Sequence, residues 1–171
     1  MTQTFISQLP EHVGQSTTLK GWIYNHRSSG KIAFLQFRDG TGFCQVIANQ
    51  ATLTPEQWAD VQKLTLESSV VLTGIVSKHP KKEDYELQLT DIQLVQIAED
   101  YPIGKKEHGP DFLLDNRHLW LRSSKQWAIQ RVRDTIISAT YEYFHDNHFI
   151  KIDAPILTPN ACEGTTTLFE M

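Results

Sequence analysis

The sequence predicts a small five-stranded antiparallel β-barrel followed by the opening helix and strand of a second domain. Strand-like runs with turn residues between them fill the first 98 residues, and one short helix interrupts them after the third run. A long amphipathic helix follows residue 122. We therefore divide the chain into a barrel at residues 1–98, a hinge at 99–122 and the start of a second domain at 123–171.

The first three strands lie between Thr17 and Asn49. Aromatic and β-branched residues fill three runs, and the sequences Ser-Ser-Gly at 28–30 and Asp-Gly-Thr-Gly at 39–42 separate them. Such short polar breaks connect antiparallel neighbours, so the three runs are predicted to pair in order.

A short helix and two more strands complete the barrel. Thr54 is a good cap and Pro55 a good first helical residue, and the helix is predicted to run to about Leu66. Strands are expected at Val70–Ser77 and Tyr85–Ile97, on either side of the polar turn 79–84. This order is that of an OB-fold, whose open face binds single-stranded nucleic acid. A small barrel with another task has the same pattern, because fold does not fix function.

Composition and charge limit the classes of function. With 40% apolar and 21% charged residues the chain is an ordinary globular protein, and its net charge of −4 disfavours coating of nucleic acid by bulk charge. Between Thr18 and Gly40, however, the sequence has four basic residues and a single acidic one, Asp39; the basic residues are Lys20, Arg27, Lys31 and Arg38. Such a basic patch can attract phosphates, although ordinary proteins carry similar patches.

The chain shows no sign of a membrane segment, a signal peptide or a metal site. No apolar run reaches the roughly 20 residues of a spanning helix, so a cytoplasmic protein without a membrane partner is expected. Cys44 and Cys162 have no Cys or His at metal-ligand spacing. Both thiols are expected to be reduced and no metal is predicted.

The second part begins after an irregular, Gly- and Pro-containing hinge. Ser123 or Ser124 can cap a helix of about 23 residues, whose apolar positions recur at steps of three and four. Residues 149–155 then resemble a strand ended by Pro155. Asn147 and His148 precede that strand, and both tolerate left-handed backbone at such a turn.

These elements together resemble the class II aminoacyl-tRNA synthetases of the aspartyl, asparaginyl and lysyl subgroup. The long helix followed by residues 149–157 (Phe-Ile-Lys-Ile-Asp-Ala-Pro-Ile-Leu) is similar to the first signature motif of that class, a dimer-interface helix and strand. Gly-Trp at 21–22 and Phe-Arg-Asp-Gly at 37–40 fit the subgroup's barrel. The segments 101–109, 117–122 and 163–169 resemble the asparaginyl branch rather than the aspartyl alternative.

The resemblance implies an anticodon-reading barrel that binds tRNA(Asn), with RNA and not DNA as its partner. Carried over by position, Phe34 would stack on the middle base, Gln45 would read that uridine and Arg27 would lie near phosphate or base. Glu86 would accept a hydrogen bond from the first anticodon base. Without the resemblance, Phe34 fits a core residue of an apolar strand, and Gln45 and Glu86 fit ordinary exposed strand residues.

For the second domain the resemblance implies asparagine activation with ATP and Mg²⁺, transfer to tRNA, and a homodimer. Glu163 would meet the ammonium group of the amino acid and Pro155 would shape the dimer contact. The second and third motifs of the class, which hold ATP, do not occur in these 171 residues, so no productive ATP binding is expected from them. A free-standing tRNA-binding or regulatory module is therefore the alternative. The long helix is expected to present unpaired apolar surface and to promote self-association.

Overall fold

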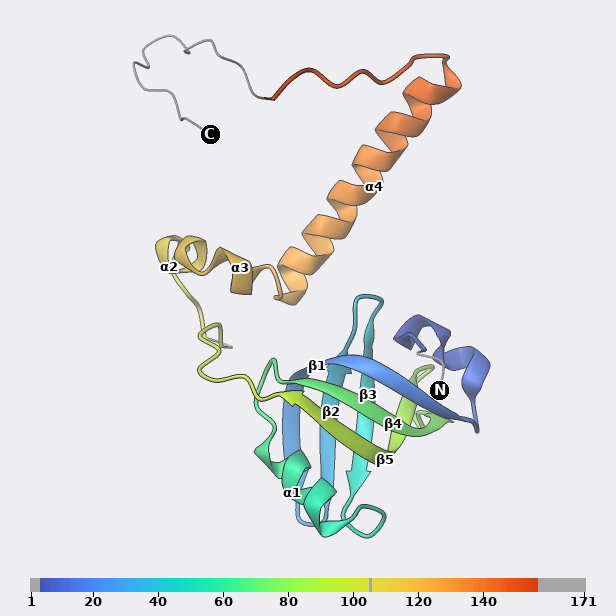
Figure 1. Cartoon of the computed structure of the whole chain (residues 1–171), viewed down its shortest axis with the longest axis vertical. Coiled ribbons are helices and arrows are strands. Elements are labelled where there is room, and N and C mark those ends of the chain that lie inside the picture. The colour runs from blue at the N-terminus through green and yellow to red at the C-terminus, as the bar shows by residue number, and fades with distance from the viewer. Residues whose placement is uncertain (1–3, 105, 157–171) are drawn as a thin grey trace. The chain divides into compact units, whose positions relative to one another are not determined.

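The computed structural model describes residues 4–104 and 106–156. It divides into two compact units between Glu107 and His108, inside the segment predicted as a hinge. The first unit holds all five strands and the second holds the long helix (Figure 1). Each unit is described by itself below.

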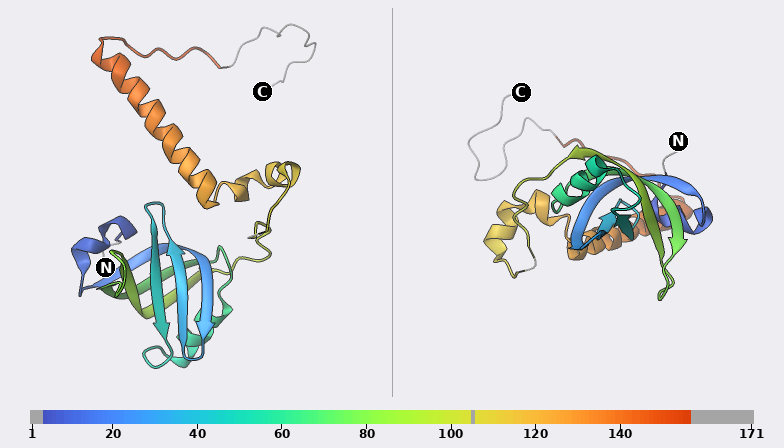
Figure 2. Two further views of the ribbon diagram at one scale, coloured as in Figure 1. Left: turned by 180° about the vertical axis from the view of Figure 1, so that it is seen from behind. Right: turned by 90° about the horizontal axis from the view of Figure 1, so that it is seen from below.

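The first unit is a closed five-stranded barrel, as predicted. Its strands close in the order β1-β2-β3-β5-β4, and they are β1 (Ser16–Ser29), β2 (Ile32–Arg38), β3 (Phe43–Asn49), β4 (Ser69–Lys78) and β5 (Tyr85–Gln96). Four of the five neighbouring pairs are antiparallel, whereas β3 and β5 pair in parallel. The strands wrap around one shared interior (Figure 2).

Strand β1 is long enough to pair with two neighbouring strands along different parts of its length. Its first part pairs with β4 and its second part with β2, and both ladders meet at Trp22. Next to that point Gly21 allows close approach, because a Cβ there would lie 2.2 Å from the carbonyl oxygen of Arg38. A register shift between Ile23 and Asn25 then bends the strand.

Alternation along the strands produces the core. In β2, residues Ala33, Leu35 and Phe37 are buried while their neighbours face outward, which is the period-two pattern of a strand with one covered face. The core also includes residues from the other strands, from helix α1 and from the N-terminal 3₁₀ helix: Ile6, Leu9, Leu19, Ile23, Val46, Val61, Leu72, Val76, Leu87 and Leu89 among them.

Helix α1 (Pro55–Lys63) lies at one end of the barrel (Figure 1). The predicted start is confirmed, because the Thr54 side chain accepts from the backbone N–H of Gln57. The helix ends three residues before the predicted Leu66. Leu64 has an extended backbone and is buried in the core, so it leaves the helical path to fill the barrel end.

A 3₁₀ helix at Ile6–His12 was not predicted. Asp39 holds it from the β2–β3 turn, since one carboxylate oxygen accepts from the backbone N–H of Ile6 at 2.8 Å. The other oxygen accepts from the N–H groups of Thr41 and Gly42 and so closes the turn itself. A contact between residues 33 positions apart leaves no local signal in the sequence.

The second unit contains two short helices and one long one. Helices α2 (Pro110–Asp115) and α3 (Arg117–Trp120) occupy part of the segment that was predicted to be an irregular hinge. Helix α4 (Ser124–Asp146) has 23 residues and Ser123 as its capping side chain, as predicted. His148 has φ 66°, so the expected left-handed turn after the helix is confirmed.

The predicted strand at residues 149–155 is wrong for this structure. The segment has no regular secondary structure, and Ile150 and Ile152 are both 87% exposed. A strand needs a neighbour to pair its backbone N–H and C=O groups, and the described residues provide none here. Pro155 lies exposed in this segment.

Among residues 4–104 and 106–156, no helix has both the length and the apolar character needed to cross a membrane.

Candidate nucleic-acid interface

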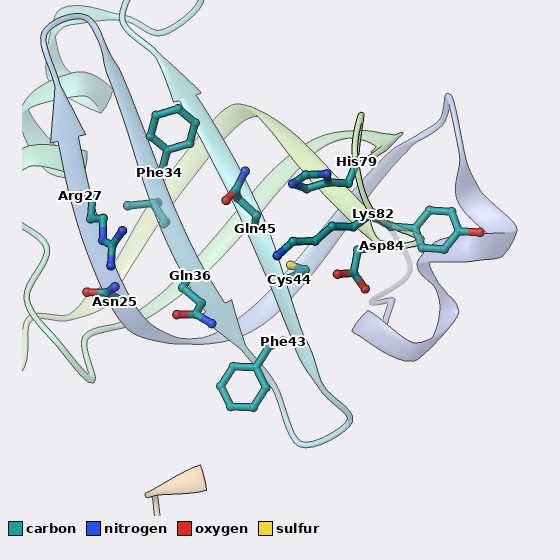
Figure 3. Close-up of a pocket in the computed structure, with 12 residues that line it drawn as sticks. Asn25, Arg27, Phe34, Gln36, Phe43, Cys44, Gln45, His79, Lys82 and Asp84 are labelled. Atoms are coloured by element: carbon teal, nitrogen blue, oxygen red, sulfur yellow. The ribbon is translucent and has the colours of Figure 1, made fainter. Parts of the chain in front are cut away.

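The outer face of β1, β2 and β3 carries a pocket of about 310 Å³. Strand pairing brings its residues together, because Arg27 pairs with Phe34 and Gln36 with Gln45. Gln45 in turn pairs with Glu86 of β5, next to the pocket. Figure 3 shows the side chains that line the pocket: Asn25, Arg27, Phe34, Leu35, Gln36, Phe43, Cys44, Gln45, His79, Lys82, Asp84 and Tyr85.

Phe34 presents its ring on this outer face. It is 37% exposed, whereas its neighbours Ala33 and Leu35 are both fully buried. The alternation of β2 therefore places Phe34 outside the core, and the ring is available to an unstacked base. Stacking of a base on an exposed aromatic ring contributes about 1–3 kcal/mol to binding.

Arg27 lies beside Phe34 on β1 and is exposed. Its guanidinium group is permanently charged and offers donors in a plane that matches a phosphate or a base edge. Figure 3 shows Arg27 and Asn25 together on one side of the pocket. The structure thus brings Arg27, Phe34 and Gln45 into one pocket.

Gln45 and Glu86 are hydrogen-bonded to each other across the parallel β3–β5 pair. The Gln45 Nε2 group donates to Glu86 Oε1 at 2.7 Å. Glu86 is only 3% exposed, so its carboxylate does not face solvent as an ordinary surface residue of a strand does. Its predicted contact with the first anticodon base remains a prediction.

The loop between β4 and β5 covers Glu86, and the sequence alone did not indicate this. His79 Nε2 lies 3.4 Å from Glu86 Oε1, and the backbone N–H of His79 donates to the carbonyl of Asp84 at 2.8 Å. Lys82 and Asp84 also line the pocket. The only sequence signal was a charged turn just before Glu86, which is common at any hairpin.

A second exposed aromatic residue, Phe43, lies at the opposite end of the pocket and was also missed. It is 38% exposed, and its ring packs edge-on against Tyr24 with centroids 5.0 Å apart. Phe43 is the first residue of β3 and lies two positions before Gln45, so both side chains point to the outer side of the strand. Phe34 and Phe43 therefore lie on opposite sides of the polar centre of the pocket (Figure 3).

Cys44 lines the pocket with an unreactive thiol. Burial, together with the nearby negative charge of Asp39, raises the pKa of its thiol from 9.0 to about 12. The thiolate is the nucleophilic form of cysteine, so a thiol with this pKa is inert near neutral pH.

Pro155 belongs to the second unit, and Glu163 and Cys162 lie outside the described residues. Within the part of the chain that is described, no group of three or more His, Cys, Asp or Glu side chains is placed to hold a metal ion.

Comparisons with known proteins agree with these two parts of the chain. The family "OB-fold nucleic acid binding domain" matches residues 17–95, and the family "tRNA synthetases class II (D, K and N)" matches residues 109–171. The asparagine–tRNA ligase of Symbiobacterium thermophilum is 46% identical over 166 residues, and that of Streptococcus suis is 48% identical over 174. Each alignment covers 96% of this chain but only 38% and 39% of the relative's length.

Solved structures give the same result. The chain resembles asparaginyl-tRNA synthetase from Pyrococcus horikoshii complexed with asparaginyl-adenylate, with a TM-score of 0.86 and 32% identity over 99% of this chain and 40% of that one. Aspartyl-tRNA synthetase from Entamoeba histolytica is more distant, with a TM-score of 0.77 and 25% identity over 92% and 40% of the two chains. In sequence and in fold, the chain belongs to the class II tRNA synthetases of the D, K and N group, and the curated relatives named above are asparagine–tRNA ligases.

Proposed function

We propose that the barrel binds the anticodon loop of tRNA(Asn) and that the whole protein attaches asparagine to that tRNA. The observation that supports this most strongly is the exposed Phe34 ring beside Gln45 and Arg27 in one pocket. RNA loops suit such a pocket, because their unstacked bases offer both a ring face and a base edge. The proposed compartment is the cytoplasm, where tRNA is charged for protein synthesis.

Each group in the pocket has a separate task in the proposed complex. Phe34 stacks on the middle base, Gln45 binds the edge of that uracil, and Arg27 and Lys82 attract phosphates. A direct contact of Glu86 with the first base requires the His79 side of the loop to move away, because Glu86 is covered in this structure.

The family implies ATP and Mg²⁺ for the activation of asparagine. The described residues hold no set of carboxylate and imidazole donors placed for a divalent cation, so they do not fit that role by themselves. Glu163, which we propose to meet the substrate ammonium group, and the homodimer contact near Pro155 belong to the same synthetase function. Asparagine-dependent exchange of pyrophosphate into ATP tests whether these 171 residues catalyse, and measurable exchange would contradict the expectation of no productive ATP binding.

The second candidate is a tRNA-binding module that acts without catalysis. The barrel favours it, because all five strands, their core and the pocket lie within the first compact unit. Binding of RNA without pyrophosphate exchange is the result that this candidate predicts.

Binding of RNA hairpins tests the proposed function directly. The chain is titrated with a hairpin carrying the anticodon GUU and with one carrying GCU, in the wild type and in Phe34→Ala. We expect a preference for GUU, and a loss of about 1–3 kcal/mol in binding free energy in Phe34→Ala. Isothermal calorimetry or fluorescence anisotropy at fixed salt measures both.

Ile32→Ala is the matched control. Ile32 lies on the same strand, is also 37% exposed and does not line the pocket. The Ile32→Ala protein should therefore bind the GUU hairpin as tightly as the wild type. Equal, salt-sensitive binding of both hairpins by the wild type would mean that only the positive charges act, and the proposed anticodon site would have to be abandoned.

A further inference from the structure

The Gln45 side chain can face the pocket in two ways, and its partner selects one of them. A carboxamide has a donor end and an acceptor end of nearly the same shape, so a free Gln can present either to a ligand. A glutamate carboxylate only accepts hydrogen bonds. With Glu86 Oε1 at 2.7 Å, the amino end of Gln45 must be directed toward Glu86.

Glu86 is itself fixed by its surroundings. The backbone N–H of Lys81 donates to His79 Nδ1 at 3.0 Å, so the neutral imidazole carries its proton on Nε2. That Nε2 lies 3.4 Å from the same Oε1 that Gln45 contacts. The Glu86 side chain is 4% exposed and the His79 side chain 18%, so water has little access to this contact.

We infer that Glu86 and His79 are positioning residues that make Gln45 specific for uracil over cytosine. This inference rests on the proposed anticodon function, and it assigns to Glu86 an action through Gln45 rather than on a base. The Gln45 Oε1 atom is left to accept from the pocket side. At ring position 3 uracil carries an N–H donor, whereas cytosine carries a bare nitrogen acceptor, so the fixed carbonyl oxygen fits uracil and opposes cytosine.

Stacking is what makes this orientation decisive. A carboxamide free to turn can pair with either pyrimidine, because both offer one donor next to one acceptor. Phe34 and Gln45 line the same pocket. In the proposed complex, a base held on the Phe34 ring presents its ring position 3 to one end of Gln45 only. Loss of the hydrogen bond between Gln45 and Glu86 should therefore change the selectivity between bases more than the affinity for the GUU hairpin.

The test compares Glu86→Gln with Glu83→Gln. A Gln at position 86 can accept from Gln45 or donate to it, so both orientations become available. Glu83, in contrast, is an exposed carboxylate of the loop between β4 and β5. With GUU and GCU hairpins, we expect the preference for GUU to fall about fivefold or more in Glu86→Gln. Glu83→Gln should keep the wild-type ratio, although it removes the same charge.

A reciprocal exchange separates orientation from simple structural support. In the double variant Gln45→Glu/Glu86→Gln, both oxygens at position 45 can only accept, so the preference for GUU should return even if overall affinity is lower. The thermal midpoint of each variant is measured alongside. A preference that stays at the wild-type value in Glu86→Gln would overturn the inference, and so would a double variant without preference.

The outcomes distinguish this inference from the proposed function. If the wild type itself does not prefer GUU over GCU, the anticodon function fails and the inference falls with it. If the wild type prefers GUU and Glu86→Gln retains that preference, the inference fails alone. A third hairpin, AUU, detects direct reading of the first base: if Glu86→Gln loses discrimination at that base and not at the middle one, Glu86 is a base reader and not a positioning residue.

Discussion

At the scale of single residues, Cys44 shows how the barrel interior lies directly behind the face that carries the pocket. It follows the outward Phe43 and precedes the outward Gln45 on β3, and its own side chain is buried. Its thiol pKa is raised to about 12 by burial and by Asp39. We expect Cys44 to resist alkylation at pH 8 in the folded protein and to react readily in urea, as measured by mass spectrometry of the peptide that contains it.

The same pKa predicts how stability changes at high pH. The folded state holds the Cys44 proton more strongly than the unfolded chain, so this contribution is complete below pH 9.0 and is lost as pH rises toward about 12. The loss has an upper bound of about 1.4 kcal/mol per pH unit. The free energy of unfolding from urea titrations should thus fall more steeply above pH 9.0 in a Cys162→Ser protein than in Cys162→Ser/Cys44→Ala. If the free energy of unfolding depends on pH in the same way in both proteins, the prediction is contradicted.

The sequence could predict part of the site and not the rest. Phe34 and Gln45 occupy alternate positions of clear strands, so their outward direction follows from the period of two once the buried residues are recognised. The burial of Glu86 depends on His79 folding back over it and on the parallel β3–β5 register. Neither a loop conformation nor a pairing between strands 41 residues apart is encoded in a local pattern.

At the scale of elements, the close approach of β1 to β2 depends on a residue without a side chain. A Cβ at Gly21 would lie 2.2 Å from Arg38 O and 2.7 Å from Phe37 Cζ, whereas a Cβ at Gly40 would meet nothing within 4 Å. Gly21→Ala should therefore lower the free energy of unfolding by about 1–3 kcal/mol or more.

Gly40→Ala is the control for this prediction and should leave stability nearly unchanged. Urea denaturation followed by tryptophan fluorescence compares the two variants with the wild type. Equal midpoints for Gly21→Ala and Gly40→Ala would show that β1 and β2 can separate without loss, and the close approach at Gly21 would then have no energetic weight.

Elements were predicted well wherever local chemistry decides them. The five strands and the capped starts of α1 and α4 match because alternation, Thr54 and Ser123 are local signals. The strand predicted at 149–155 is absent because a strand depends on a partner, and the apolar pattern alone cannot supply it. Helices α2 and α3 were missed because six and four residues leave too short a pattern to detect.

At the scale of the whole molecule, helix α4 offers an apolar stripe that the described chain does not cover. Val132, Ile136 and Tyr143 are 59%, 60% and 64% exposed and share one face. We expect the 171-residue chain to self-associate through this stripe, in keeping with the proposed homodimer. Sedimentation velocity over a range of concentrations should show association in the wild type and less of it in Ile136→Lys.

Ser138→Lys adds the same charge on the opposite face of α4 and serves as the control. It should associate as the wild type does. A wild-type protein that sediments as a single monomer at all concentrations would contradict the prediction and would leave the exposed stripe without a role in assembly.

The parallel contact between β3 and β5 has a consequence for the order in which the protein folds. Hairpins such as β1–β2 and β2–β3 join neighbouring parts of the chain, whereas Gln45 and Glu86 come together only when remote strands meet. Pairings at large sequence separation carry the greater loop-closure cost and slow folding. We therefore expect β3 and β5 to pair late in folding, so that Gln45 meets its Glu86 partner only once the barrel has closed.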